Sequence, residues 1–305
     1  MGKNALCSIG RQIKVRRLEI KKTSAPEIVD RILRESTPAS QFVFDCDGTL
    51  IKGDIASLTA WVLLRLGLAQ PELLPPEWDD FKEKPFDYSE FRKLRKIIIE
   101  KKGTLSVYEW EGFLHSGLPP ATSQDAARFA VQEGLKSGSL EFTGALSELA
   151  KTVAQQAWIV SGSPDICVWA IGECLKIPPQ KILATKFETV DGIYAARIHP
   201  PGVIWEGLKR KILEDHGVPD PYFVAGDTTG DWDMMEISKS WVWAVIWGKH
   251  RDRGEEFLNH IRDHLKKSTG EDSLPQESGL YYFQEPSGLK RKWVLEVRDG
   301  KAIGP

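Results

Sequence analysis

Short apolar runs recur along the middle of the chain, and helical patterns separate them. The runs end at Phe44, Val160, Ala225 and Ile246, and each of the first three is followed at once by Ser, Gly or Asp. A run of this kind is typical of a buried parallel strand, because both faces of such a strand are covered. Strands that alternate with helices predict an α/β fold with a Rossmann-like doubly wound parallel sheet, in which ligands bind at the carboxyl ends of the strands.

The segment between the first two runs is longer than one crossover requires. Its pattern from residue 55 to residue 134 is helical with breaks at prolines, which predicts an inserted α-helical cap. A further helix is expected from Ala25 to Glu35, and a hairpin turn at Asp191-Gly192. Strands are expected around Tyr281–Phe283 and Lys292–Val297. The expected domains are a basic arm and helix (1–40), a Rossmann-like catalytic core (41–54 and 135–269), the helical cap (55–134) and a C-terminal β-hairpin extension (270–305).

Composition places the chain among ordinary globular proteins. With 41% hydrophobic residues, 28% charged residues and a formal net charge of −2, no strong attraction to nucleic acid or anionic lipid is expected. Basic residues gather between Lys3 and Lys22, which favours a solvated arm over a segment that docks on a polyanion or a membrane. No secretory signal, no apolar stretch of bilayer length and no metal-ligand spacing among the four cysteines are found, so the cytoplasm is the expected location. His115, His199 and His216 show no catalytic or metal spacing and are expected in loops or at the surface.

An acidic motif, Asp45-Cys46-Asp47-Gly48-Thr49, begins where the first apolar run ends. Residues two apart on an extended backbone point the same way, so Asp45 and Asp47 can face one substrate. Phosphoryl transfer needs a nucleophile, a proton donor for the leaving oxygen and cations near the phosphoryl oxygens. Asp45 can attack, and Asp47 can act first as acid and then as base. Acidic turns of this composition are common, so the motif alone is only moderately specific.

Two further polar clusters follow the second and third runs. Ser161-Gly162-Ser163 supplies a hydroxyl and backbone N–H groups at the start of a helix, which can cradle a phosphate, although the same residues also suit a loop or helix cap. Asp227 and Asp231, with Asp45 across the sheet, suit an octahedral Mg²⁺ site, and the alternative is a capped loop. Three such clusters in order, each after its own strand, predict a phosphoryl-transfer site.

These motifs resemble those of the haloacid dehalogenase superfamily, and within it the branch with a helical cap after the first motif, which includes the phosphoserine phosphatases. The likeness is carried by Phe42–Leu50, Ile159–Ile171 and Val224–Met235 and spans about residues 41–250. It implies a Mg²⁺-dependent phosphatase, a phosphoric monoester hydrolase that forms an aspartyl-phosphate on its nucleophile. A phosphotransferase with the same phosphoenzyme, and a catalytically weak protein that binds a phospholigand, are the alternatives.

The resemblance also implies a role for each matching residue. Asp45 resembles the nucleophile and metal ligand, and Asp47 the acid/base that lends its backbone carbonyl to the metal. The dehalogenase and phosphonatase branches lack the acid at the second position, so Asp47 favours hydrolysis of phosphate esters. Thr49 and Ser161, with Gly162, resemble the phosphate-binding residues. Asp227 resembles the second metal carboxylate, and Asp231 is grouped with the metal ligands as its partner.

A lysine in the helix before the last motif departs from the family pattern. The family places it where this chain has the segment from Trp205 to Leu208, which contains no lysine. Lys209 lies within one turn and is predicted to hold the nucleophile and phosphate, and Lys211 is the next candidate. The alternative is that both are exposed helix lysines.

Two cap residues bear on the substrate, predicted to be a small phosphorylated metabolite. Asp54 lies where phosphoserine phosphatases carry a Glu for the substrate ammonium, although related hydrolases without amino substrates also have Asp there. Arg95 falls where their carboxylate-binding Arg lies, or else belongs to a solvated helix face. An amino-alcohol phosphate such as phosphoserine or phosphocholine is therefore the leading expectation. The cap tryptophans are expected mainly to pack, although one or two could line an aromatic pocket for a trimethylammonium group; they are Trp61, Trp78 and Trp110.

Overall fold

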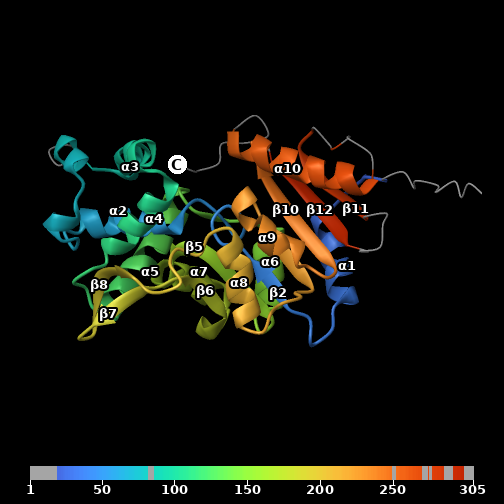
Figure 1. Cartoon of the computed structure of the whole chain (residues 1–305), viewed down its shortest axis with the longest axis horizontal. Helices are drawn as coiled ribbons and strands as arrows, with labels where there is room; N and C mark the ends of the chain where they lie inside the picture. Colours follow the sequence, from blue (N-terminus) through green and yellow to red (C-terminus); the bar gives the residue numbers. More distant parts are fainter. Residues whose placement is uncertain are drawn as a thin grey trace, which may run out of the picture.

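An eight-stranded sheet forms the centre of the computed structural model, which describes residues 19–81, 86–248, 252–269, 274, 277–284 and 291–298 (Figure 1). Its strand order is β1-β11-β12-β10-β9-β2-β5-β6. The strands from β12 to β6 run parallel, and β11 is antiparallel to both of its neighbours. The strands are β1 (Lys21–Thr23), β2 (Phe42–Phe44), β5 (Ala157–Pro164), β6 (Ile182–Thr185), β9 (Phe223–Gly226), β10 (Trp241–Trp247), β11 (Gly279–Gln284) and β12 (Lys292–Arg298).

Strand β2 shows why the apolar runs are continuous. It pairs with β5 on one side and β9 on the other, so its backbone is satisfied within the sheet. Phe42 and Phe44 enter the hydrophobic cluster on one face, and Val43 enters the cluster on the opposite face. Each of these side chains is fully buried, and burying one contributes roughly 1.5–3 kcal/mol. Successive residues must therefore all be apolar, which confirms the doubly wound α/β fold predicted from the sequence.

Helices cover both faces of the sheet. One hydrophobic cluster contains residues of α1, α6 and α7, and the other contains residues of α8, α9 and α10. The predicted helix from Ala25 to Glu35 is confirmed as α1, whose Ile28 and Ile32 are buried. The helices of these two layers are α1 (Ala25–Glu35), α6 (Ala145–Thr152), α7 (Asp165–Leu175), α8 (Gly207–Asp215), α9 (Trp232–Glu236) and α10 (Asp252–Thr269).

The predicted cap segment is helical, and Figure 1 shows its helices grouped on the side of the molecule away from β11 and β12. The three tryptophans of this segment pack within it. The indole N–H of Trp61 donates to the backbone carbonyl of Phe86, and Trp78 packs edge-on against the ring of Phe86. Trp110 stacks on the ring of Phe91. The elements are α2 (Ile55–Arg65), α3 (Tyr88–Lys102), α4 (Thr104–Phe113) and α5 (Pro120–Ser137), with 3₁₀ turns η1 (Pro71–Leu73) and η2 (Pro76–Asp80).

The remaining short elements include the predicted hairpin. Strands β7 and β8 are antiparallel, and Asp191 and Gly192 between them both have positive φ, which is typical of a tight hairpin turn. The short elements are β3 (Ile51–Lys52), β4 (Glu141–Phe142), β7 (Phe187–Val190), β8 (Ile193–Ile198), η3 (Pro179–Lys181) and η4 (Thr229–Asp231).

Within the described ranges, no helix has the length and apolar character needed to span a membrane.

The two predicted C-terminal strands are present and belong to the main sheet. Strand β12 pairs with β11 in antiparallel fashion and with β10 in parallel along its whole length. Strand β1 adds to the far edge of β11. The basic arm before residue 19 lies outside the described residues.

One histidine lies in a turn, as expected, but is buried there. His115, expected in a loop or at the surface, is buried after α4, and its Nε2 lies 3.7 Å from the Sγ of Cys167. Burial lowers the pKa of His115 to about 4, because the imidazolium would lose its hydration. The sequence carried no signal for this, because the position depends on packing against α7.

We expect Trp293→Ala to lower the free energy of unfolding by about 3–5 kcal/mol, because a large buried aromatic side chain is lost. Trp293 lies in β12 and stacks against Phe283 and Trp232, so the effect measures how far β12 belongs to the core. Denaturant unfolding followed by circular dichroism gives the value. The control Val190→Ala, at a side chain 51% exposed on β7, should change it by less than about 0.5 kcal/mol.

Stability should also fall as the pH drops from 6.5 to 4, because His115 binds a proton in the unfolded chain before it does so in the folded one. The folded pKa is depressed, so the loss occurs as pH falls and amounts to roughly 3 kcal/mol at most. Unfolding free energies at a series of pH values, measured for the wild type and for His115→Gln, test this. If the free energy of unfolding changes equally with pH in the two proteins, His115 is not the cause of the loss of stability.

Candidate active site

Three polar segments meet at the carboxyl edge of the sheet. Asp45 directly follows β2, Ser161 lies near the end of β5, and Asp227 directly follows β9. Because β2 lies between β5 and β9 and all three run parallel, these strand ends are adjacent. The predicted phosphoryl-transfer residues are thus brought to one place.

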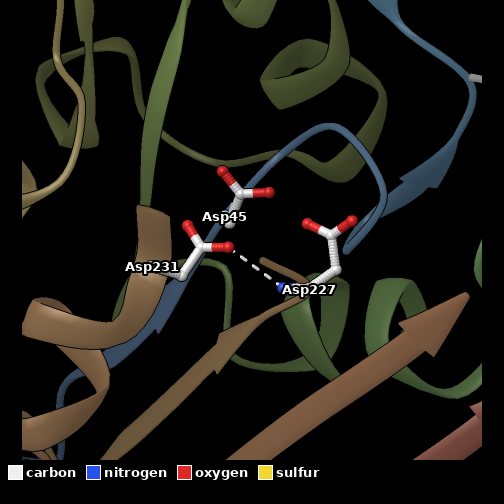
Figure 2. Close-up of side chains that lie close together, drawn as sticks. All are labelled: Asp45, Asp227 and Asp231. Carbon is white, nitrogen blue, oxygen red and sulfur yellow. Dashed lines mark hydrogen bonds between the residues drawn. The ribbon is translucent and has the colours of Figure 1, made fainter. Parts of the chain in front are cut away.

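An acidic cluster forms the centre of this edge (Figure 2). Asp45, Asp227 and Asp231 each offer a carboxylate oxygen, and the three oxygens lie within 4.8 Å of one another. The Oδ2 of Asp231 accepts hydrogen bonds from the backbone N–H groups of Asp227 and Thr228, both at 3.0 Å. Asp231 therefore fixes the loop that carries Asp227.

Lys209 lies between two of these carboxylates. Its Nζ donates to the Oδ1 of Asp45 and to the Oδ1 of Asp231, each at 2.6 Å, and the side chain is buried. The alternative of an exposed helix lysine is therefore wrong for Lys209, while Lys211 on the same helix is exposed. Burial alone would lower the pKa of Lys209, but the charges of Asp231 and Asp45 outweigh it and raise the pKa above its usual range.

Asp47 is held by two donors. Its Oδ1 accepts from the backbone N–H of Ile55 at 2.8 Å, and its Oδ2 accepts from the hydroxyl of Ser163 at 2.6 Å. Burial raises the pKa of Asp47 well above its usual value, and the charge of Asp54 adds to the effect. The sequence motif included Ser163, but its role in orienting Asp47 became visible only in the structure.

The glycine of the first motif permits close packing against the acidic loop. Gly48 has φ +89°, and a Cβ there would lie 2.0 Å from the Oδ2 of Asp227, so a side chain is excluded. Its carbonyl accepts from the indole N–H of Trp247 at 2.6 Å. The hydroxyl of the buried Thr49 donates to the Oδ1 of Asp227 at 3.4 Å. Thr49 thus lies beside the acidic cluster, and its role as a phosphate ligand stays a prediction.

The second motif is built around two serines and a glycine. The buried Oγ of Ser161 accepts from the backbone N–H of Ser163 at 3.1 Å, and the carbonyl of Gly162 accepts from the hydroxyl of Thr185 at 2.7 Å. A Cβ on Gly162 would approach the carbonyl of Ile204 to 3.3 Å. The motif is therefore closely packed next to Asp45, and phosphate binding by Ser161 and Gly162 remains a prediction.

The charge of the cluster suits a divalent cation. Burial raises the pKa of Asp45 to about 7, with a further increase from Asp231 and an opposing effect from Lys209. Burial and the charges of Asp45 and Asp231 raise the pKa of Asp227 well above its usual value. Three carboxylates face one ammonium, and carboxylate oxygens are the ligands that Mg²⁺ prefers. Asp45 and Asp227, with Asp231 beside them, therefore fit a magnesium ion, while a contribution from the carbonyl of Asp47 stays a prediction.

The sequence profile of the haloacid dehalogenase-like hydrolases matches residues 42–236. The chain belongs to this family. The match covers all three motifs and confirms the family inferred from them. In a sequence comparison, no curated protein matches the chain.

Solved structures share the fold of this hydrolase. A protein of unknown function from Bordetella pertussis Tohama I is 16% identical with a TM-score of 0.54, and the match covers 75% of this chain and 96% of that one. A conserved protein of unknown function from Anaerococcus prevotii is 14% identical with a TM-score of 0.53, covering 79% and 89%. A phosphoserine phosphohydrolase-like protein from Francisella tularensis is 16% identical with a TM-score of 0.43, covering 72% and 92%. At these identities the first two matches, whose TM-scores exceed 0.5, show a shared fold alone.

The two predicted substrate residues of the hydrolase contact each other. The Nη2 of Arg95 donates to the Oδ2 of Asp54 at 2.8 Å, and its Nε donates to the Oε1 of Glu111 at 2.7 Å. Arg95 is buried, so the alternative of a solvated helix face is wrong for it. Glu111 was missed in the sequence, because Glu109 lies two residues before it on the same helix and nothing in the pattern separates the buried acid from the other one.

We expect Asp227→Asn to weaken Mg²⁺ binding by about tenfold or more, since even outer-shell changes around a metal cost this much. Isothermal titration of the full chain with MgCl₂ measures the affinity. The matched control is Asp220→Asn, which removes an exposed carboxylate paired with Lys239. Equal affinities in Asp227→Asn and the wild type would mean that the acidic cluster does not bind the ion.

Proposed function

We propose that this hydrolase is a Mg²⁺-dependent phosphatase that releases phosphate from a small phosphomonoester through an aspartyl-phosphate on Asp45. The observation that carries the proposal is the pair of acids at the end of β2. Asp45 is held by Lys209, while Asp47, two residues on, is held separately by Ser163 and the backbone of Ile55. Two acids with separate anchors can take two different roles in one reaction.

The nucleophile would be the Asp45 carboxylate. It attacks the phosphorus, the bond from phosphorus to the ester oxygen breaks, and Asp47 gives its proton to that oxygen. Burial raises the pKa of Asp47, which is the direction that favours a proton donor. In the second half, Asp47 takes a proton from the water that attacks the phosphoryl group, and phosphate leaves Asp45. Bound Mg²⁺ would neutralise charge on the phosphoryl oxygens.

Lys209 supports this reaction by favouring the ionised form of Asp45 and by orienting its carboxylate. The ammonium at 2.6 Å opposes the effect of burial on the pKa of Asp45. The hypothesis of a catalytically weak binding protein rested on the shifted spacing of this lysine. Its contact with Asp45 supports the phosphatase over that alternative.

The helical segment α2–α5 would act as a cap that closes over the site and excludes water while the phosphoenzyme forms. Tyr108 of α4 lies against Trp205, which precedes α8, with ring centroids 5.8 Å apart. This contact joins the segment to the core beside the second motif, because a Cβ on Gly162 would lie 3.6 Å from the indole of Trp205. An amino-alcohol phosphate such as phosphoserine or phosphocholine is the proposed substrate class, because Asp54 offers a carboxylate on the cap side.

We expect Asp45→Asn to abolish Mg²⁺-dependent phosphate release, with at least about a thousandfold loss, because the nucleophile is removed. Phosphate release from p-nitrophenyl phosphate and a panel of small phosphomonoesters, with and without chelator, measures this. Asp220→Asn should retain wild-type rates. Undiminished release from Asp45→Asn would exclude the phosphoenzyme.

Asp47→Asn separates the two steps of the same reaction. The leaving p-nitrophenolate needs no proton, so this variant should still form the phosphoenzyme and release a rapid burst of p-nitrophenol. Hydrolysis of the phosphoenzyme needs the missing base and should be slowed by about 100-fold or more. Stopped-flow absorbance records the burst, and equal slowing of both phases would contradict the assignment of Asp47.

A further inference from the structure

Strand β12 carries a cation to the edge of the sheet where the site lies. It runs parallel to β10, and Arg298 at its carboxyl end is in register with Trp247 at the carboxyl end of β10. The guanidinium of Arg298 lies over the indole of Trp247, 4.6 Å from the ring centroid. The match to the family profile ends at residue 236. This pair therefore lies outside the part of the chain that carries the three motifs.

The indole of Trp247 connects the two strands to the first motif. Its N–H donates to the carbonyl of Gly48 at 2.6 Å. The backbone N–H of Gly48 donates to the carbonyl of Ile51 at 2.7 Å, so both polar backbone groups of this glycine are engaged. Strand β10 is paired on both sides, with β9 and with β12. The sheet therefore fixes the position of the indole, and the indole fixes the turn at Gly48.

The turn held in this way contacts both carboxylate oxygens of Asp227. The Cα of Gly48 faces Oδ2, because a Cβ there would lie 2.0 Å from that atom. The hydroxyl of Thr49 donates to Oδ1 at 3.4 Å. A displacement of the turn would therefore displace the carboxylate that the acidic cluster offers to a magnesium ion. Groups that orient a metal ligand contribute strongly to the affinity for the metal.

The guanidinium of Arg298 is itself held in place. Its Nε donates to the Oε1 of Glu296 at 2.7 Å, and the Oε2 of the same carboxylate accepts from the indole N–H of Trp243 at 2.9 Å. Its Nη2 donates to the carbonyl of Thr143 at 3.4 Å. The hydroxyl of Thr143 donates in turn to the carbonyl of Thr49 at 2.6 Å. The guanidinium is thus fixed over the indole and is linked to the first motif by a second route.

We infer that Trp247 and Arg298 are positioning residues, through which the C-terminal strand β12 sets the affinity of the acidic cluster for Mg²⁺. The inference rests on the proposed function, in which the cluster holds this ion. Arg298 fixes the indole, the indole fixes the turn at Gly48, and the turn fixes the carboxylate of Asp227. The role of both residues is indirect, because it acts through the backbone of the first motif and requires no contact with the ion.

Trp247→Phe removes the indole N–H and keeps an aromatic ring under the guanidinium. Calorimetric titration of the full chain with MgCl₂ should show binding weakened by about tenfold, the lower end of the cost of changing groups around a metal ligand. The matched control is Trp241→Phe at the opposite end of β10. Trp241 also donates through its indole, to Glu35, and also lies under a cation of β12, the Nζ of Lys292, 5.0 Å from the ring centroid. This control should bind Mg²⁺ with wild-type affinity.

Two variants of Arg298 test the contribution of the cation. Arg298→Lys keeps a cation over the indole and should retain most of the wild-type affinity for Mg²⁺. Arg298→Gln removes the cation and should weaken binding by about threefold, the size expected for a cation on an aromatic face. Its side chain is 18% exposed, so this variant decides the inference if Trp247→Phe does not fold.

Three results of these titrations would overturn the inference. The first is wild-type affinity for Mg²⁺ in folded Trp247→Phe. The second is wild-type affinity in folded Arg298→Gln. The third is equal weakening in Trp241→Phe, which would mean that any change in β10 loosens the site. Circular dichroism establishes that each variant is folded.

The kinetics of phosphate release give a readout that a merely structural role would not produce. In Trp247→Phe the MgCl₂ concentration for half-maximal release from p-nitrophenyl phosphate should rise about tenfold, in line with the titration. The kcat at saturating MgCl₂ should stay near the wild-type value, because the ion then occupies the site. A fall in kcat that saturating MgCl₂ does not reverse would contradict the assigned role.

The two proposals fail in different ways. Absence of turnover on every ester, with Mg²⁺ binding retained by the wild type, would reject the phosphatase function. The titrations alone then decide the inference. A wild type that does not bind Mg²⁺ would overturn the inference directly.

Discussion

The site depends on one buried ammonium between two carboxylates. Removing charges from water is costly, and a buried ion is tolerated only when its partners are close and well oriented. Lys209 meets that condition with Asp45 and Asp231, which come from loops after different strands. The contact links three elements, β2, α8 and the loop after β9, at the edge where chemistry would occur. The remaining negative charge of the cluster is what makes it suitable for a divalent cation.

Much of this arrangement could be predicted from sequence, because it follows from short local patterns. Apolar runs give strands, parallel strands place their carboxyl ends together, and the acids directly after the runs must then be neighbours. Lys209 was predicted for a different reason, the resemblance to a family. Its shift along the helix is accommodated because α8 begins at Gly207 and its first turn already faces Asp45.

The features that could not be predicted depend on contacts between distant segments. Glu111 and Arg95 lie on different helices, and neither position alone shows that the two meet. His115 is buried because α7 covers it, which no local pattern records. The place of β12 between β10 and β11 could not be predicted either. A strand pattern indicates that a strand is present but does not indicate which strands it pairs with. In each case the missing information was the identity of a partner.

The position of β12 has a consequence for biosynthesis. Strand β10 has the sequence Trp-Val-Trp-Ala-Val-Ile-Trp, and β12 pairs with one of its edges only after α10 and β11 have been made. Until then a nascent chain exposes an apolar, unpaired strand edge of the kind that seeds aggregation. Ribosomal stalling or proteolytic nicking between residues 248 and 291 would leave the phosphoryl-transfer residues intact but the sheet open. Closure of the sheet therefore depends on a strand that contributes none of the phosphoryl-transfer residues.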